Sequence, residues 1–170
     1  LLDSGEVRAL DVKKGDTVEA GDVLTDGAPN PATIVEHKGV GEGRRYFVQE
    51  FRRTLKDANI GADRRNVELI ARGLVNHVRL TDEVGNYVPD DVVPYDVLEA
   101  GWEPRAGTRR VRAGAAAGKY LERPALHYSI GTRVGKKVAD TLAEFGVQDI
   151  DVHDDPPPFK AEMVRGMENL

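Results

Sequence analysis

The sequence predicts an α+β fold, with a small β-sandwich module, a helical pair and a small α/β part at the C-terminus. Three observations support this prediction. Residues 12–27 place apolar side chains around two Gly-Asp pairs, and residues 40–75 repeat apolar side chains at helical spacing. Residues 125–152 show a strand, a helix and a second strand pattern in turn. The aromatic content of 6% indicates a core that is mostly aliphatic.

The N-terminal stretch, residues 12–27, is expected to form short strands joined by tight turns. The pairs Gly15-Asp16 and Gly21-Asp22 end two of the short runs, and each glycine is expected to take a positive φ. Compact hairpins of this pattern are typical of barrel-sandwich-hybrid modules. Biotinyl and lipoyl carrier modules share the pattern, but the next turn, residues 26–29, has no lysine to carry the group. A carrier domain is therefore the weakest alternative.

Helices are expected from residue 30 to about residue 76. Asn30-Pro31 begins a short helix with Ile34 and Val35 directed inward, and Asp63 is expected to cap a later one. Between them, a longer helix follows Gly39. The side chains that give it helical spacing are Tyr46, Phe47, Phe51 and Leu55.

The second half of the chain is expected to alternate short strands and helices. We expect a strand-turn-strand over residues 78–89, a helical turn near Val97, a strand over 125–130 and a helix from Gly131 that Gly146 ends. After this helix we expect a strand over 147–152, a proline-rich arm and a helical turn over 163–167. Three stretches result: residues 1–100 with the sandwich module and helices, a flexible Arg/Gly/Ala loop over 101–118, and an α/β element over 119–170.

Composition excludes several classes of function. The chain has 170 residues, a formal net charge of −5 and no cysteine, so disulfide frameworks and thiolate zinc sites are excluded. No apolar run reaches the roughly 18–20 residues of a membrane span. The histidines lack the spacing of a zinc site; they are His37, His77, His127 and His153. We expect no cofactor, metal or membrane partner.

Arginines are the candidate nucleic-acid-binding residues, because cationic side chains neutralise phosphates and release counterions. They occur in a basic helix and in a basic loop, and the alternative interpretation is a solvated helix face and an ordinary surface loop. The candidates are Arg44, Arg45, Arg52, Arg53, Arg109, Arg110 and Arg112.

Several short motifs follow one another in a specific order over residues 12–80. They include Thr25-Asp26-Gly27, Lys38-Gly39-Val40 and a helix with Val67-Glu68-x-Ile70-x-Arg72. In this order they resemble the C-terminal region of the bacterial DNA-directed RNA polymerase β′ subunit. The chain departs from the family at Asn66, where the family has histidine, and residues 101–170 show little of its pattern.

The resemblance implies a non-catalytic structural portion of a β′-like subunit, in the cytoplasm, with contacts to other polymerase subunits and to the nucleic-acid channel. The family's magnesium-binding Asp-x-Asp-Gly-Asp loop does not occur in this sequence, although a longer parent could be a nucleotidyltransferase. The start at Leu1, without methionine, favours a piece of a longer polypeptide. The divergence leaves an alternative, in which the module is reused as a structural or interaction protein of a phage particle or its DNA-delivery machinery, with virion proteins as partners.

Overall fold

The computed structural model describes residues 10–25 and 27–163, and it confirms the α+β architecture. In these residues the helices are α1 (Pro31–Asp57), α2 (Arg64–Leu74), α3 (Tyr95–Ala100) and α4 (Lys136–Glu144), with a 3-10 turn η1 (Ala113–Ala115). The strands are β1 (His77–Leu80), β2 (Val92–Pro94), β3 (Arg109–Arg112), β4 (Tyr120–Leu121), β5 (Asp149–His153) and β6 (Phe159–Glu162).

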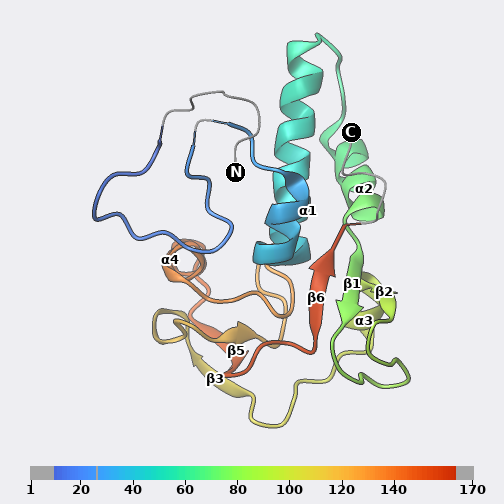
Figure 1. The fold of residues 1–170 in the computed structure, drawn as a ribbon, viewed down its shortest axis with the longest axis vertical. Helices are drawn as coiled ribbons and strands as arrows, with labels where there is room; N and C mark the ends of the chain where they lie inside the picture. Colours follow the sequence, from blue (N-terminus) through green and yellow to red (C-terminus); the bar gives the residue numbers. More distant parts are fainter. Residues whose placement is uncertain (1–9, 26, 164–170) are drawn as a thin grey trace.

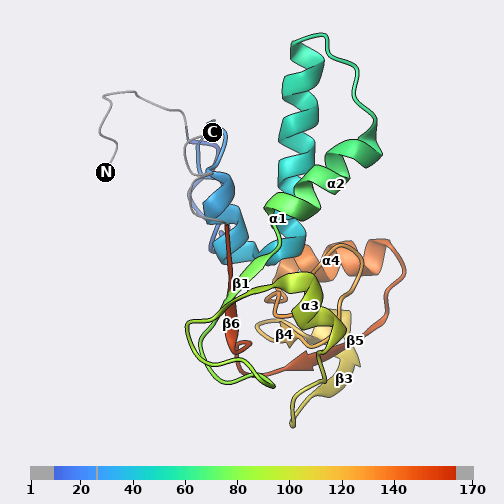
Figure 2. The same ribbon diagram turned by 90° about the vertical axis from the view of Figure 1, so that its right-hand side faces the viewer.

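The strands form two small antiparallel sheets, each with its own core. One sheet has the order β2-β1-β6 and packs with α3 and the start of α1 around buried residues such as Val35, Val78 and Phe159. The other has the order β3-β5-β4 and packs with α4 around residues such as Leu121 and Leu142. Figure 2 shows α1 and α2 rising together away from both sheets.

The predicted helices of residues 30–57 form one continuous element with a kink. Asn30 caps it by accepting a hydrogen bond from the Ala32 amide, and Ile34 and Val35 are buried as expected. Gly39 lies at φ 87°, outside the helical region, and this residue separates the short first part from the long second part. Asp63 caps α2 through the Arg65 amide at 2.7 Å, which confirms the second predicted cap.

The stretch 10–25 contains the two predicted turns but no strand. Gly15 and Gly21 take φ values of 103° and 83°, and the hydrogen bonds from Asp16 to Lys13 and from Asp22 to Glu19 close the turns. Within the described residues 10–25, strand pairing is limited to a single bridge between residues 10 and 25. A strand needs a neighbouring strand to satisfy its backbone groups, and one bridge does not supply this. The predicted strands of this stretch are therefore absent from residues 10–25, and the barrel-sandwich-hybrid module stays a prediction.

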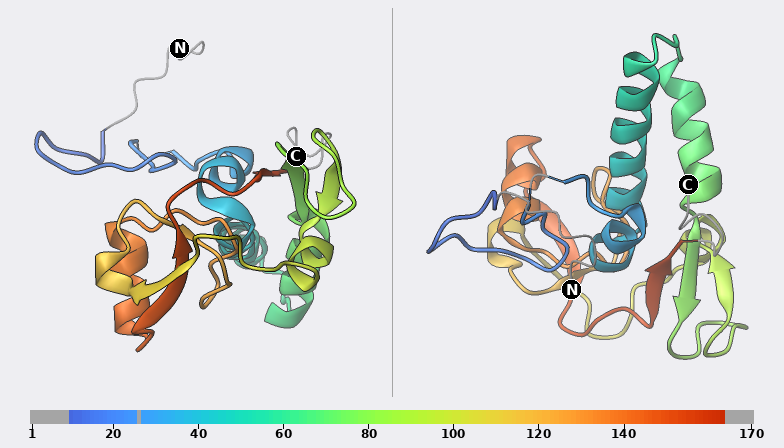
Figure 3. Two further views of the ribbon diagram at one scale, coloured as in Figure 1. Left: turned by 90° about the horizontal axis from the view of Figure 1, so that it is seen from below. Right: turned by 45° about the horizontal axis from the view of Figure 1, so that its top comes forward.

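An ion-pair network ties this stretch to α1 and α4. The Asp22 carboxylate lies 2.6 Å from Lys38 Nζ and 2.8 Å from Lys137 Nζ, and its side chain is only 7% exposed. Glu19 accepts a hydrogen bond from the Lys136 amide at the start of α4. Figure 3 shows the stretch lying beside the beginning of α1 and above α4. Residues 10–25 are therefore held by charge more than by apolar burial.

We expect Asp22→Asn to release this stretch and to flatten the acid dependence of stability. Burial raises the pKa of Asp22, but hydrogen bonds from Lys137, Lys38 and the Glu19 amide outweigh it and leave the pKa below its ordinary value of 3.8. The stabilisation is therefore complete above that value and declines as the pH falls below it. At pH 7 the loss should be about 1–3 kcal/mol, measured by chemical unfolding and by hydrogen exchange of residues 16–24.

Asp16→Asn is the matched control for this prediction. Asp16 occupies the same place in the other Gly-Asp turn, but among the described residues its exposed carboxylate accepts only from the Lys13 amide. Its replacement should change exchange in residues 19–22 little. Equal effects of the two substitutions would contradict the tethering role of Asp22.

The second half of the chain differs from its prediction in several places. Residues 101–118, expected as a flexible loop, contain β3 and η1, because residues 109–112 pair with β5. Residues 125–130, expected as a strand, make a tight turn closed by a bridge between Ala125 and Tyr128. In the predicted strand-turn-strand of residues 78–89, β1 confirms the first strand, but a tight turn with a bridge between Val84 and Tyr87 follows it in place of a second strand. Strand β6 was not predicted.

Other predictions for this half are confirmed. Helical residues occur at 95–100 and 136–144, and Gly146 follows α4 at φ 76°. Helix α4 begins later than expected, after Gly135 and not at Gly131. Strand β5 confirms the strand predicted over 147–152, although it begins at Asp149 and ends at His153. The expected helical turn over 163–167 lies outside the described residues except for Met163. The division into three stretches stays a prediction.

Candidate functional site

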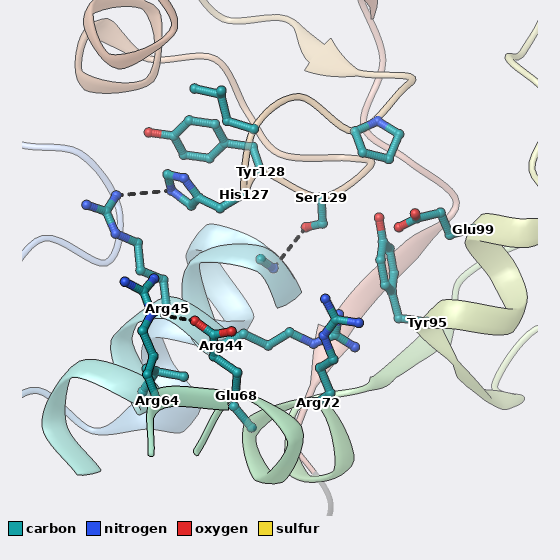
Figure 4. Close-up of a pocket in the computed structure, with 15 residues that line it drawn as sticks. Arg44, Arg45, Arg64, Glu68, Arg72, Tyr95, Glu99, His127, Tyr128 and Ser129 are labelled. Carbon is teal, nitrogen blue, oxygen red and sulfur yellow. Dashed lines mark hydrogen bonds and ion pairs between the residues drawn. The ribbon is translucent and has the colours of Figure 1, made fainter. Parts of the chain in front are cut away.

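A cavity of about 520 Å³ lies where α1, α2 and α3 meet the turn of residues 124–129 (Figure 4). Charged and aromatic side chains face it from all four elements. The residues that line it are Gly41, Arg44, Arg45, Val48, Arg64, Glu68, Ala71, Arg72, Tyr95, Glu99, Pro124, Leu126, His127, Tyr128 and Ser129.

Arg44 is held rigidly at one side of the cavity. Its Nε donates to the Val75 carbonyl at 2.7 Å, and its Nη2 donates to Asn76 Oδ1 at 2.8 Å and to Asp96 Oδ1 at 3.1 Å. The guanidinium also lies over the Tyr95 ring, 5.8 Å from its centroid. These contacts join α1 to the end of α2 and to α3, so Arg44 has a structural role.

His127 and Glu42 join the opposite side of the cavity to α1. His127 Nε2 contacts both Glu42 Oε1 and Arg45 Nη1, the latter at 3.2 Å. Burial raises the pKa of Glu42, but the hydrogen bond and charge of His127 and the charge of Arg45 outweigh it, so this pKa lies below its ordinary value. The pair fixes the 124–129 turn against α1.

Buried polar groups form the base of the cavity. Ser129 Oγ accepts from the Gly41 amide at 3.2 Å, and the Tyr95 hydroxyl accepts from the Ile130 amide at 2.9 Å. Burial, with the hydrogen bond to Glu99, raises the pKa of Tyr95 strongly, so its hydroxyl keeps its proton over the ordinary pH range. The bottom of the cavity therefore presents uncharged hydroxyl groups that hydrogen bonds hold in place.

The wall formed by α2 carries two more cations. Arg64 Nε lies 2.6 Å from Glu68 Oε1, one helical turn along the same face. Arg72 lines the cavity next to Arg44, and within the described part of the chain its guanidinium makes no ion pair or hydrogen bond. Among the described residues, no protein group accepts from the Arg72 guanidinium.

The structure divides the seven predicted arginines among three places. Arg44 and Arg45 line the cavity, whereas Arg52 and Arg53 lie farther along α1, beside a second hollow of about 500 Å³. The other three are on β3, at the opposite end of the molecule in Figure 1, where Arg109 pairs with Asp154 at 2.7 Å. They do not form one continuous surface, and nucleic-acid binding by them stays a prediction.

Sequence reasoning missed most of the cavity. Arg64, Arg72 and Ala71 share one face of a helix, a pattern that could have indicated a basic lining there. Tyr95, His127 and Ser129 come from separate elements, and no local pattern joins them. Within residues 10–25 and 27–163, no group of three or more His, Asp or Glu side chains could hold a metal ion. No helix in this described part is long and apolar enough to cross a membrane.

Comparison with known proteins points to one family over part of the chain. No family model matches. The DNA-directed RNA polymerase subunit β′ of Endomicrobium trichonymphae is 36% identical over 75 residues, which is 44% of this chain and 5% of that protein. That of Aquifex pyrophilus is 32% identical over 105 residues, or 56% of this chain and 7% of that protein. The β′ subunit of Desulforudis audaxviator is 30% identical over 110 residues, which is 64% of this chain and 9% of that protein.

The chain is similar to a segment of RNA polymerase β′. The similarity confirms the resemblance that the motifs of residues 12–80 predicted. The chain spans only 5 to 9% of the length of these relatives, so the activity and partners of a whole β′ subunit do not transfer directly. What the comparison shows is a similarity to one segment of these subunits.

Proposed function

We propose that this chain is a non-catalytic structural portion of a β′-like subunit of a DNA-directed RNA polymerase, which contributes contacts to other subunits and to the nucleic-acid channel. The observation that carries the proposal is the identity of 30 to 36% with β′ subunits over about half of the chain. In such an assembly its partners would be the remaining polymerase chains.

Exposed apolar side chains support a role in subunit contacts. Leu69 and Ile70 on α2 and Ile60 in the α1–α2 connection are exposed, and Leu69 keeps 67% of its surface accessible. They occur on the helical hairpin that stands away from both sheets (Figure 2). Apolar side chains gathered on a projecting element are typical of a surface that another chain covers.

The charge of the same hairpin supports contact with nucleic acid. Residues 44–72 contain eight arginines and lysines and four acidic residues, whereas the whole chain has a net charge of −5. Such an uneven distribution gives the hairpin a local positive field, which attracts phosphate backbones.

Affinity purification of the tagged full-length protein from its native cells, followed by mass spectrometry, tests this proposal. We expect other RNA polymerase subunits in stoichiometric amounts. Recovery with capsid or tail proteins would instead support the reused structural module, and recovery of the protein alone would also contradict a role in polymerase assembly.

The double substitution Leu69→Glu with Ile70→Glu should weaken this recovery. Charges placed in an apolar contact are desolvated without partners, and a loss of at least about 1.4 kcal/mol corresponds to a tenfold weaker association. Phe145→Glu, at the end of α4, is the matched control because Phe145 is also 67% exposed. Equal recovery with both variants would contradict a contact through α2, provided that their thermal stability is unchanged.

A further inference from the structure

The cavity between α1, α2, α3 and the 124–129 turn is lined by four arginines, of which only Arg72 has no acidic partner among the described residues. Glu68 pairs with Arg64, Asp96 with Arg44 and Glu42 with Arg45. In Figure 4 the Glu99 carboxylate lies at the hydroxyl end of Tyr95, away from the guanidinium groups of Arg44 and Arg72. An anion at this end of the cavity would therefore meet Arg72, whose charge no acidic side chain of the described residues balances.

Arg44 and Arg72 both line the cavity and both have nitrogen donors without partners among the described residues. Nε and Nη2 of Arg44 are engaged by three acceptors, which fix the plane of its guanidinium, while its Nη1 has no partner among the described residues. Arg72, from α2, likewise has no partner in the described part, and in Figure 4 it points to the same end of the cavity. Two guanidinium groups directed at one place favour a doubly charged oxyanion, because each forms charge-assisted hydrogen bonds with it.

The remainder of the cavity suits an organic group. Val48, Ala71, Pro124 and Leu126 contribute apolar surface, and a volume of about 520 Å³ is within the range of small-molecule sites. Leu126 lies at φ 54°, a conformation that a bulky side chain rarely adopts, and its side chain is still partly exposed at the cavity. Such backbone strain is found preferentially at ligand sites.

We propose that this cavity binds an organic phosphate, with its phosphate group between Arg44 Nη1 and Arg72 and its organic part against the apolar wall. This inference goes beyond the proposed structural role and does not depend on it. A phosphate group with an attached sugar and base is present both in a free nucleotide and in a nucleic-acid strand, and the experiment below distinguishes these two sources.

Calorimetric titration of the full chain with AMP at low salt tests the site. We expect saturable binding with one site per chain. Arg72→Gln should weaken it at least tenfold, because it removes a charged donor to the phosphate. The variant should stay folded, because Arg72 has no structural partner in the described residues. Arg65→Gln is the matched control, since Arg65 is the exposed neighbour of Arg64 on α2 and does not line the cavity. It should change the affinity less than twofold.

Competition with a 12-nucleotide single strand identifies the source of the phosphate. Displacement of AMP by the strand, with the same sensitivity to Arg72→Gln, would assign the site to a nucleic-acid backbone. AMP binding that the strand does not displace would assign it to a free nucleotide. The proposal is overturned if AMP does not bind at millimolar concentration, or if Arg65→Gln weakens binding as much as Arg72→Gln, because the interaction would then be non-specific.

Discussion

Arg105→Ala is expected to lower the free energy of unfolding by about 3–5 kcal/mol, since it leaves a buried carboxylate without its counter-ion. The Glu122 side chain is 1% exposed. It accepts hydrogen bonds from Arg105 Nε at 2.8 Å, from Nη2 at 2.6 Å and from the Arg105 amide at 3.0 Å. Arg105 also donates to the carbonyls of Asp155 and Pro156, so the substitution releases the proline arm as well. Unfolding by guanidinium chloride at pH 7 measures the lost free energy of unfolding.

Two further variants separate this effect from a general loss of charge. Arg109→Ala breaks an ion pair with Asp154 in which both side chains are more than half exposed and screened by water, so it should cost far less than Arg105→Ala. The double substitution Arg105→Met with Glu122→Met removes both charges and should recover most of the stability lost by Arg105→Ala. Equal losses in Arg105→Ala and Arg109→Ala would contradict the account.

Sequence reasoning succeeded where the determinants are local. Asn30, Asp63 and Gly146 mark helix ends through contacts within a few residues, and the structure places each at a helix end. Gly15 and Gly21 likewise take the positive φ that their turns require. These signals are independent of the rest of the chain, so one sequence suffices to read them.

Sequence reasoning failed where the determinants are distant in the chain. Strand β6 follows three prolines and exists because Phe159 pairs with Leu80 of β1, which no local pattern indicates. The sequence predicts a flexible loop around Arg105, but its partner Glu122, buried directly after β4, holds that loop in place. Charge alone makes Arg44 a nucleic-acid-binding candidate, but its acceptors come from two distant stretches, Val75-Asn76 and Asp96. Cavities are defined by such contacts, so their linings were the least predictable part.

Gly41→Ala is expected to destabilise the protein by about 3 kcal/mol and to disrupt the cavity, because α1 approaches the 124–129 turn too closely for any side chain. A Cβ at this position would lie 1.9 Å from the His127 carbonyl oxygen and 2.9 Å from the Ser129 amide nitrogen. Both are backbone atoms and cannot rotate away, so the turn itself has to move. The hydrogen bond from the Gly41 amide to Ser129 Oγ would be strained at the same time.

Gly73→Ala, in α2, provides the matched control. No atom lies within 4 Å of a Cβ there, and alanine is favoured over glycine in a helix, so this variant should be more stable by about 0.5–1 kcal/mol. Chemical unfolding of both variants, with AMP titration of whichever remains folded, checks the prediction. Since the turn supplies His127 and Leu126 to the cavity, Gly41→Ala should weaken AMP binding, whereas Gly73→Ala should leave it unchanged. A Gly41→Ala protein as stable as the parent would show that α1 and the turn are not in contact in solution.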